Sequence, residues 1–164
     1  MTPEEAYIYH LESAAQICEQ QGWGDPLSYA RSKEIYAAIR HGHKIADTYS
    51  GADAINENGD EVEYKSTIAK RCKGAYTGIS VQETWEKQVR YLFEEKIAKY
   101  PEHYFNRFKE GKLVESWKMK GTDVFNILLP KLKKAYPHVL NKKDPRLSAN
   151  ITWREIQQYG TQVI

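Results

Sequence analysis

A pair of segments on either side of Glu110-Gly111 constrains the fold more strongly than any other part of the sequence. Residues 103–108 alternate in the manner of a half-buried strand, and residues 112–119 provide a partner strand after the glycine turn. A hairpin of this kind buries one face and leaves the other to water, so a second layer has to cover the apolar face. The chain is therefore expected to fold around a sheet.

Apolar residues at helical spacing indicate the elements that cover this sheet. Two helices are expected in the first quarter of the chain, one over residues 4–21 and one from Pro26 to about Arg40 with Ile35, Ala38 and Ile39 on one face. A third is expected over 82–99, with Trp85, Val89, Leu92 and Phe93 toward the core. A fourth is expected to begin at a cap at Thr122 or Asp123 and to kink at Pro130. Shorter elements are expected as strands over 52–56 and 60–67, as a polar, basic loop over 141–150, as a helix or turn over 153–159, and as an edge strand over 161–164. This order favours one domain over 1–164 of the α/β (mixed α+β) class.

The composition limits the classes of protein to which the chain can belong. Its 164 residues suffice for one domain, and a net charge of +2 neither requires nor excludes nucleic acid as a partner. No apolar run reaches the roughly 18 residues that a membrane span needs, and residues 1–5 lack a secretory signal, so we expect no membrane and a cytoplasmic, intracellular location. Cys18 and Cys72 form no CxxC pair, so we expect no zinc and two free thiols.

Charged residues in the stretch 51–66 form the candidate active site. Side chains at positions i and i+2 of a strand share a face, so Glu63 and Lys65 point the same way while Tyr64 points to the opposite face. The alternative interpretation is an ordinary charged hairpin in which the Glu63–Lys65 pair is solvated.

The turn between the two strands decides whether Asp53 belongs to this site. A two-residue loop at 58–59 would set Asp53 opposite Tyr64, on the other face. A three-residue loop at 57–59, with its glycine left-handed, pairs Asp53 with Glu63. Both turns suit the sequence, and we favour the three-residue turn because it gathers the three charged groups.

Two adjacent carboxylates repel each other unless a cation neutralises them, and a hard divalent ion with oxygen ligands does so. Asp53 and Glu63 are therefore candidate Mg²⁺ ligands, with the Tyr64 carbonyl as a further ligand, and Mn²⁺ is expected to substitute. Lys65 is placed to orient or deprotonate an attacking water, or to balance charge on the phosphorane.

A continuous run of residues carries a resemblance to a known family. In order and without gaps it comprises Gly51, Asp53, Ala54, Gly59, Glu63, Lys65, Ser66, Lys73 and Gly74, and the chain closes with Tyr159-Gly160-Thr161. With these residues the chain resembles the PD-(D/E)XK nuclease superfamily, and within it the PvuII-like type II restriction endonucleases. The resemblance implies a restriction-endonuclease-like fold, with a central mixed sheet flanked by helices. It also implies that Asp53 and Glu63 hold the metal and that Lys65 is the catalytic lysine.

By the same resemblance, a homodimer cleaves both strands of a short DNA palindrome and leaves blunt ends, and the N-terminal helical part, residues 1–42, contributes to the dimer. In-line attack by water would leave 5′-phosphate and 3′-hydroxyl ends. The chain departs from the family at the place where a family member uses consecutive histidines to recognise bases, because this chain has Gly78, Ile79 and Ser80 there. A helix over 81–100 also has no counterpart. Alternatives are a homing or phage-encoded endonuclease with a longer target, or a catalytically silent DNA-binding protein on the same fold.

Cations and hydroxyl groups downstream of the catalytic strand are of the types that contact phosphates and base edges. The expected DNA-binding residues are Lys70, Arg71, Lys73, Tyr76, Thr77, Ser80 and Gln82, together with Lys142, Lys143 and Arg146 of the polar loop. Two accessory candidates lie upstream. Glu34 either stands near the metal or forms a surface pair with Arg31 or a lysine, and His43 either reaches the site or is solvated. Asp47 and Asp60 are expected in turns.

Overall fold

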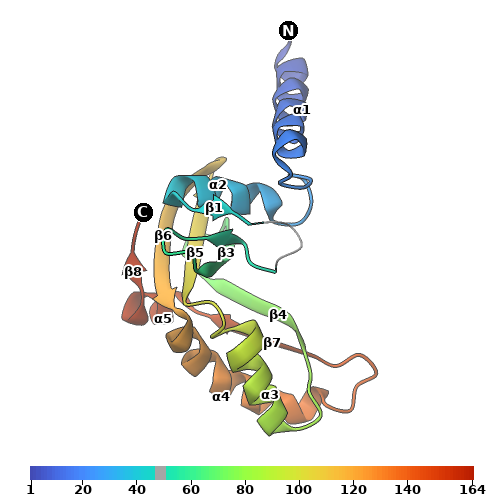
Figure 1. The fold of residues 1–164 in the computed structure, drawn as a ribbon, viewed down its shortest axis with the longest axis vertical. Helices are drawn as coiled ribbons and strands as arrows, with labels where there is room; N and C mark the ends of the chain where they lie inside the picture. Colours follow the sequence, from blue (N-terminus) through green and yellow to red (C-terminus); the bar gives the residue numbers. More distant parts are fainter. Residues whose placement is uncertain (47–50) are drawn as a thin grey trace. The chain divides into compact units, whose positions relative to one another are not determined.

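The structure is a computed structural model that describes residues 1–46 and 51–164, so the turn expected at Asp47 lies outside the described residues. The chain forms two compact units, Met1–Gly59 and Asp60–Ile164, and each is described by itself (Figure 1). Both units combine helices with strands, which confirms the mixed α/β class. That the two units form the single expected domain stays a prediction. None of the described helices is long and apolar enough to cross a membrane.

The first unit contains α1 (Pro3–Gln21), α2 (Arg31–His41), β1 (Lys44–Ile45) and β2 (Ala54–Ile55), and its two strands pair antiparallel. The first helix agrees with expectation. Thr2 and Glu5 form a capping box at its start, and Gly22, at φ 69°, ends it in the left-handed conformation.

The second helix begins later than expected. Asp25 accepts hydrogen bonds from the backbone N–H of Leu27 on its side chain, at 2.9 Å, and from that of Ser28 on its carbonyl, at 3.1 Å. Tyr29 then adopts φ 49°, which a continuous helix cannot accommodate. These turns replace the expected first helical turn at Pro26. Ile39, expected on the buried face of this helix, is 60% exposed.

The turn that precedes the strand carrying Glu63 and Lys65 has the local conformation that a three-residue loop requires. Gly59 is left-handed at φ 83°, and its N–H donates to the Asn56 carbonyl at 3.0 Å. The expected pairing of Asp53 with Glu63 joins the two units and stays a prediction.

The second unit is built on a mixed sheet. Its strands are β3 (Glu61–Thr67), β5 (Glu102–Lys109), β6 (Lys112–Lys120) and β8 (Thr161–Gln162), in the order β3-β5-β6-β8. β3 and β5 run parallel, and the other pairs are antiparallel. Residues 103–106 are all buried, so β5 is not the half-buried strand that its alternation suggested. Both of its faces are covered, because Phe105 packs into the core on one face and Tyr104 packs against Tyr64 of β3 on the other.

A two-stranded antiparallel ribbon accompanies this sheet. It pairs β4 (Gly74–Ser80) with β7 (Arg146–Ile151), so the second half of the expected 141–150 loop is a strand. A bulge interrupts the pairing between Tyr76 and Ile79, where Gly78 is left-handed at φ 65°. The chain then passes through α3 (Trp85–Tyr91) and a single π-helical segment, η1 (Leu92–Lys96), before it enters β5.

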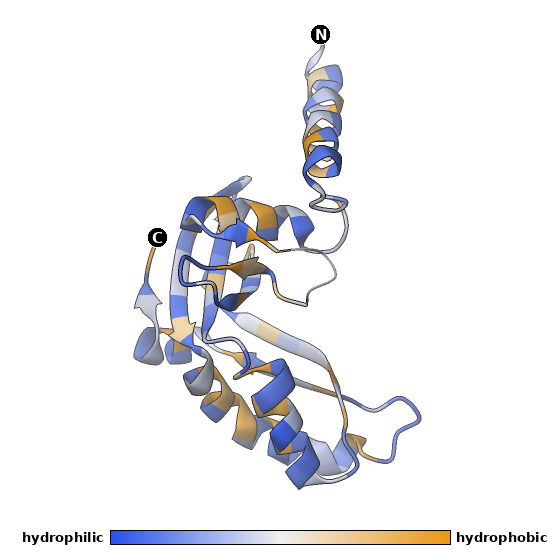
Figure 2. Cartoon of the chain, viewed as in Figure 1, coloured by the Kyte–Doolittle hydropathy of each residue, from blue (hydrophilic) through white to orange (hydrophobic). Residues whose placement is uncertain are grey.

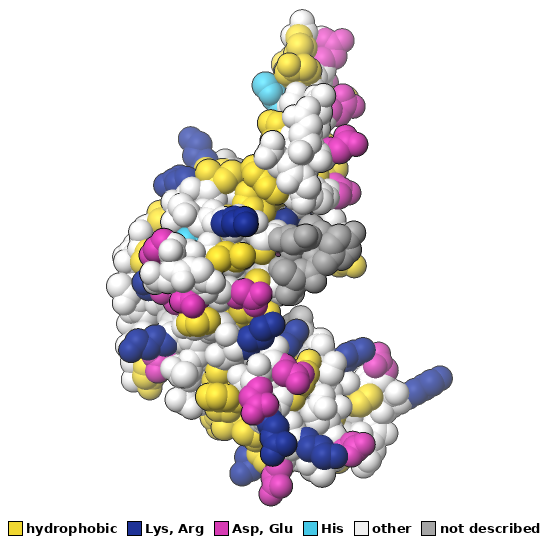
Figure 3. Space-filling model, in the orientation of Figure 1, with side chains coloured by type: hydrophobic (Ala, Val, Ile, Leu, Met, Phe, Trp, Pro, Cys, Tyr) yellow, Lys and Arg dark blue, Asp and Glu magenta, His cyan; other side chains and the backbone are white. Residues whose placement is uncertain are grey.

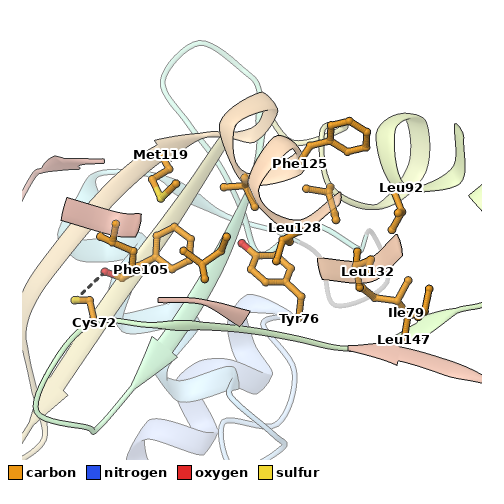
Figure 4. Close-up of a cluster of buried hydrophobic side chains, with 14 of the residues drawn as sticks. Cys72, Tyr76, Ile79, Leu92, Phe105, Met119, Phe125, Leu128, Leu132 and Leu147 are labelled. Carbon is orange, nitrogen blue, oxygen red and sulfur yellow. Dashed lines mark hydrogen bonds between the residues drawn. The ribbon is translucent and has the colours of Figure 1, made fainter. Parts of the chain in front are cut away.

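Two helices cover the ribbon and one face of the sheet. They are α4 (Gly121–Val139), which contacts β7, β5 and β6, and α5 (Trp153–Tyr159). The apolar side of α4 stands out in Figure 2. Figure 4 shows the core between these layers, with Phe105 of β5 next to Cys72 and Met119. Its largest fully buried aliphatic members are Ile79, Leu92, Ile97, Met119, Leu128, Leu132, Leu147, Ile151 and Ile156.

The start of α4 differs from the expected cap at Thr122 or Asp123. The helix begins at Gly121 without a side-chain cap, and the Gly121 N–H donates instead to the Pro101 carbonyl at 2.8 Å. A Cβ at Gly121 would overlap the Tyr100 carbonyl, so this close approach requires glycine.

Candidate active site

Glu63 and Lys65 project from the same face of β3, as strand alternation predicts. The Lys65 Nζ atom lies 2.6 Å from the Glu63 Oε1 atom, and the two side chains are only 23% and 17% exposed, respectively. The Tyr64 side chain lies on the opposite face, where its ring meets the edge of Tyr104 at 5.7 Å. The ion pair is therefore partly withdrawn from water, in contrast to the solvated pair of an ordinary hairpin.

Tyr76 lies under the Lys65 ammonium. The Nζ atom stands 4.8 Å from the centre of the ring, within the range of a cation–π interaction. Tyr76 was expected to contact DNA, but it is 6% exposed and belongs to the core. Its side chain is turned away from solvent, so we omit it from the proposed DNA contacts.

His103 completes this group, and the sequence analysis did not include it. It is fully buried on β5, beside Glu63 in the parallel register. Its Nδ1 atom lies 2.8 Å from the Tyr76 hydroxyl, and its Nε2 atom lies 2.9 Å from the Ile97 carbonyl. Burial lowers the pKa of His103 to about 4, so the ring is neutral at pH 7. A histidine within an otherwise apolar strand carries no local signal of this role.

Asp53 belongs to the first unit. It lines a cavity of about 500 Å³ whose other walls include Asp25, Arg31 and Glu34. Arg31 is buried and donates to the carbonyls of Trp23, at 2.6 Å, and Ala46, at 2.9 Å. It also pairs with Glu34 at 3.2 Å. Glu34 therefore makes the Arg31 pair that its alternative interpretation described, and it also lines the same cavity as Asp53.

His43, the other accessory candidate, is not a solvated loop residue. Its side chain is 3% exposed, it stacks on His41 with 5.4 Å between ring centres, and its Nε2 atom lies 3.9 Å from a carboxylate oxygen of Glu57. Its contacts in the first unit account for its burial and assign it no role in chemistry.

The pairing of β4 with β7 brings together the two segments that were expected to bind DNA. Ser80 pairs with Arg146, whose Nη1 atom donates to the Ser80 hydroxyl at 3.1 Å. Gln82 is half-buried, and its carbonyl accepts from the Tyr136 hydroxyl at 2.6 Å. The other candidates are exposed. Lys70, Arg71 and Lys73 precede β4 at one end of the ribbon, Thr77 lies on β4, and Lys142 and Lys143 lie beyond the other end. On the face seen in Figure 3, cationic and anionic side chains are interspersed.

The donor atoms at this site fit a hard cation rather than a soft one. Within residues 1–46 and 51–164, no group of three or more His, Cys, Asp or Glu side chains is arranged to hold a metal. The Glu63 carboxylate and the Tyr64 carbonyl offer oxygen only, which suits Mg²⁺ or Mn²⁺. A carboxylate has about four lone-pair sites, so Glu63 can accept from Lys65 and ligate a cation at once.

Neither the protein-family models nor the curated proteins with which the chain was compared match it. The function is therefore inferred from the residues themselves.

Proposed function

We propose that the chain is a Mg²⁺-dependent endonuclease that hydrolyses double-stranded DNA to 5′-phosphate and 3′-hydroxyl ends, in the manner of a type II restriction endonuclease of the PD-(D/E)XK superfamily. The observation that carries this proposal is the Glu63–Lys65 pair, at 2.6 Å on one face of β3. Withdrawing two charges from water costs free energy, and phosphodiester hydrolysis is a reaction that needs both of them at one place.

The roles follow from the chemistry of each group. Asp53, Glu63 and the Tyr64 carbonyl would hold the ion, which, when bound, polarises a phosphate oxygen and activates water. Lys65 orients the water that attacks the phosphorus in line or, as a neutral amine, takes its proton; alternatively, its positive charge balances the charge that develops on the phosphorane.

The ribbon of β4 and β7 supports DNA as the substrate. A two-stranded β-ribbon fits the major groove of B-DNA. Strand β4 has seven residues, so at about 3.3 Å per residue the ribbon separates its terminal cations by roughly 20 Å. That length exceeds the groove width of about 12 Å, so it would allow cations at the two ends to contact the phosphates on both sides of a groove.

Removing a cation from either end of the ribbon is expected to weaken DNA binding by a similar factor for all sequences. Lys73→Ala and Lys142→Ala should each reduce the slope of log K against log salt by about one, because each loses one phosphate contact. Fluorescence anisotropy over a salt series measures this slope. Lys112→Ala, at the exposed start of β6, is the matched control and should leave the slope unchanged. If log K fell with log salt at the same slope in Lys73→Ala, Lys142→Ala and Lys112→Ala, the ribbon would be excluded as the DNA-binding surface.

Helix α1 supports a homodimer, which a palindromic target requires. It exposes an apolar stripe in which Tyr7 is 67%, Ile8 54% and Leu11 38% exposed. Figure 2 shows orange, hydrophobic positions between blue, hydrophilic ones along α1. An apolar stripe of this kind is suited to a second copy of the same helix.

Plasmid cleavage tests the proposal. Wild-type protein with Mg²⁺ is expected to convert supercoiled DNA directly to the linear form, because a dimer cuts both strands in one encounter, and EDTA should stop the reaction. Asp53→Asn should slow cleavage at least about 100-fold, because one metal ligand loses its charge. Accumulation of nicked circles would argue against the dimer.

The assay must include DNA of diverse sequence, because the target sequence is not specified by the chain, and it must be run with Mn²⁺ as well as Mg²⁺. A chain that cuts none of these would disprove the endonuclease proposal, and retained DNA binding would then identify the catalytically silent alternative. A footprint much longer than a short palindrome would identify the homing alternative.

A further inference from the structure

A continuous series of contacts leads from the Glu63–Lys65 pair into the core of the second unit. Lys65 Nζ donates to Glu63 at 2.6 Å and lies 4.8 Å from the centre of the Tyr76 ring. The Tyr76 hydroxyl lies 2.8 Å from His103 Nδ1, and His103 Nε2 lies 2.9 Å from the Ile97 carbonyl. The residues come from β3, β4 and β5 and from the segment after η1, so tertiary structure alone brings them together.

The direction of the hydrogen bonds in this series follows from the chemistry of its ends. A carbonyl only accepts, so the His103 Nε2 atom carries the hydrogen that is donated to Ile97. In a neutral ring the Nδ1 atom then has only its lone pair to offer, so the Tyr76 hydroxyl donates to it. Both ring nitrogens are therefore satisfied in the core, and the hydroxyl of Tyr76 is directed to one partner.

The anchor for His103 is rigid for a local reason. The Ile97 N–H donates to the Leu92 carbonyl at 2.7 Å, which closes the π-helical turn of η1. Leu92 and Ile97 are fully buried, so the Ile97 carbonyl is held in place by the core. Single π-helical turns are frequent at functional sites, and this one sets the position of the carbonyl that His103 requires.

We propose that Tyr76, oriented by His103, is a positioning residue that holds the Lys65 ammonium against Glu63 in the orientation that catalysis needs. This inference rests on the proposed function for its catalytic consequence. Lysine ends in a compact charge on a flexible four-carbon chain, so its charge alone does not define where the ammonium stands. The aromatic face and the Glu63 carboxylate together restrict it to one place.

Two substitutions separate the ring from its hydroxyl. Tyr76→Leu removes the aromatic face and is expected to slow single-turnover cleavage about 3- to 30-fold, the range that a cation–π contact covers, with the Kd for DNA unchanged. Tyr76→Phe keeps the face but loses the hydrogen bond to His103 that orients it, so cleavage should slow by a smaller factor than in Tyr76→Leu. Tyr136→Leu is the matched control, because Tyr136 is a buried core tyrosine whose hydroxyl also donates a hydrogen bond. If Tyr136→Leu slows cleavage as much as Tyr76→Leu does, the role of Tyr76 is merely structural and the inference fails.

An NMR measurement tests the positioning without any activity. A ring face shields the protons that lie over it, so the Lys65 Hε signals should be shifted upfield in the wild type and in Tyr76→Phe, but not in Tyr76→Leu; Lys65→Arg assigns them. Unshifted signals in the wild type would overturn the inference whatever the cleavage results. A wild-type chain that shows the shift yet cuts no DNA counts against the endonuclease and supports the positioning of Lys65.

Discussion

Replacing Lys65 with alanine is expected to slow Mg²⁺-dependent DNA cleavage at least about 100-fold, since positioned proton transfer and charge stabilisation each contribute factors of this size. The ammonium lies 2.6 Å from Glu63, so its removal takes away both the partner of that carboxylate and the group proposed to act on the attacking water. Single-turnover cleavage of plasmid DNA measures the rate of cleavage, and a separate binding experiment measures the affinity for DNA.

DNA affinity should change by less than about threefold in Lys65→Ala, because a group that acts in the transition state affects rate rather than ground-state binding. Lys112→Ala is the control, since Lys112 is an exposed lysine at the hairpin turn. A Lys65→Ala protein that cuts as fast as the Lys112→Ala protein would remove Lys65 from the active site. If Lys65→Ala lowered the affinity for DNA and left the cleavage rate unchanged, Lys65 would be a DNA contact.

Replacing Phe105 with alanine is expected to lower the free energy of unfolding by about 3–5 kcal/mol, the usual cost of emptying a buried aromatic site. Phe105 is fully buried on β5 and belongs to the core drawn in Figure 4. It also fills the space opposite Gly74, where an added Cβ would overlap its ring. The cavity therefore opens between β4 and β5, the two strands that carry Tyr76 and His103.

Urea denaturation of the full chain measures this effect, and Phe93→Ala is the matched control. Phe93 is 48% exposed, although its ring meets the edge of Phe125 at 5.2 Å. Its loss should cost less than about 1.5 kcal/mol, the upper end of what one aromatic pair contributes beyond its buried area. Equal losses in the two variants would contradict the packing of this core.

Local patterns in the sequence were sufficient to predict those features of the structure that depend only on residues close together in the chain. Helix α1 is predicted over residues 4–21 by the helical spacing of its apolar residues and by Gly22 at its end, and the helix follows those signals. Glu63 and Lys65 share a face because side chains alternate along any strand, and Gly59 is left-handed because its turn requires it. Mg²⁺, DNA and the endonuclease family remain predictions from the residue pattern and its resemblance.

Other features depend on pairing between distant segments, and local patterns did not reveal them. The strand at 146–151 looks like a polar loop until it pairs with β4, and β5 looks half-buried until Phe105 packs into the core on one face and Tyr104 packs against Tyr64 on the other. The second helix begins at Arg31, because the turns at Asp25 and the left-handed Tyr29 displace it.

The Glu63–Lys65 pair with which the site began illustrates both cases. Its two side chains were placed on one face by the period of a strand alone. Tyr76 and His103 joined them only because β3 pairs with β5 in a parallel register and β4 packs on the same core. Parallel strands need a long connection, so no local signal in the sequence marks which residues will meet.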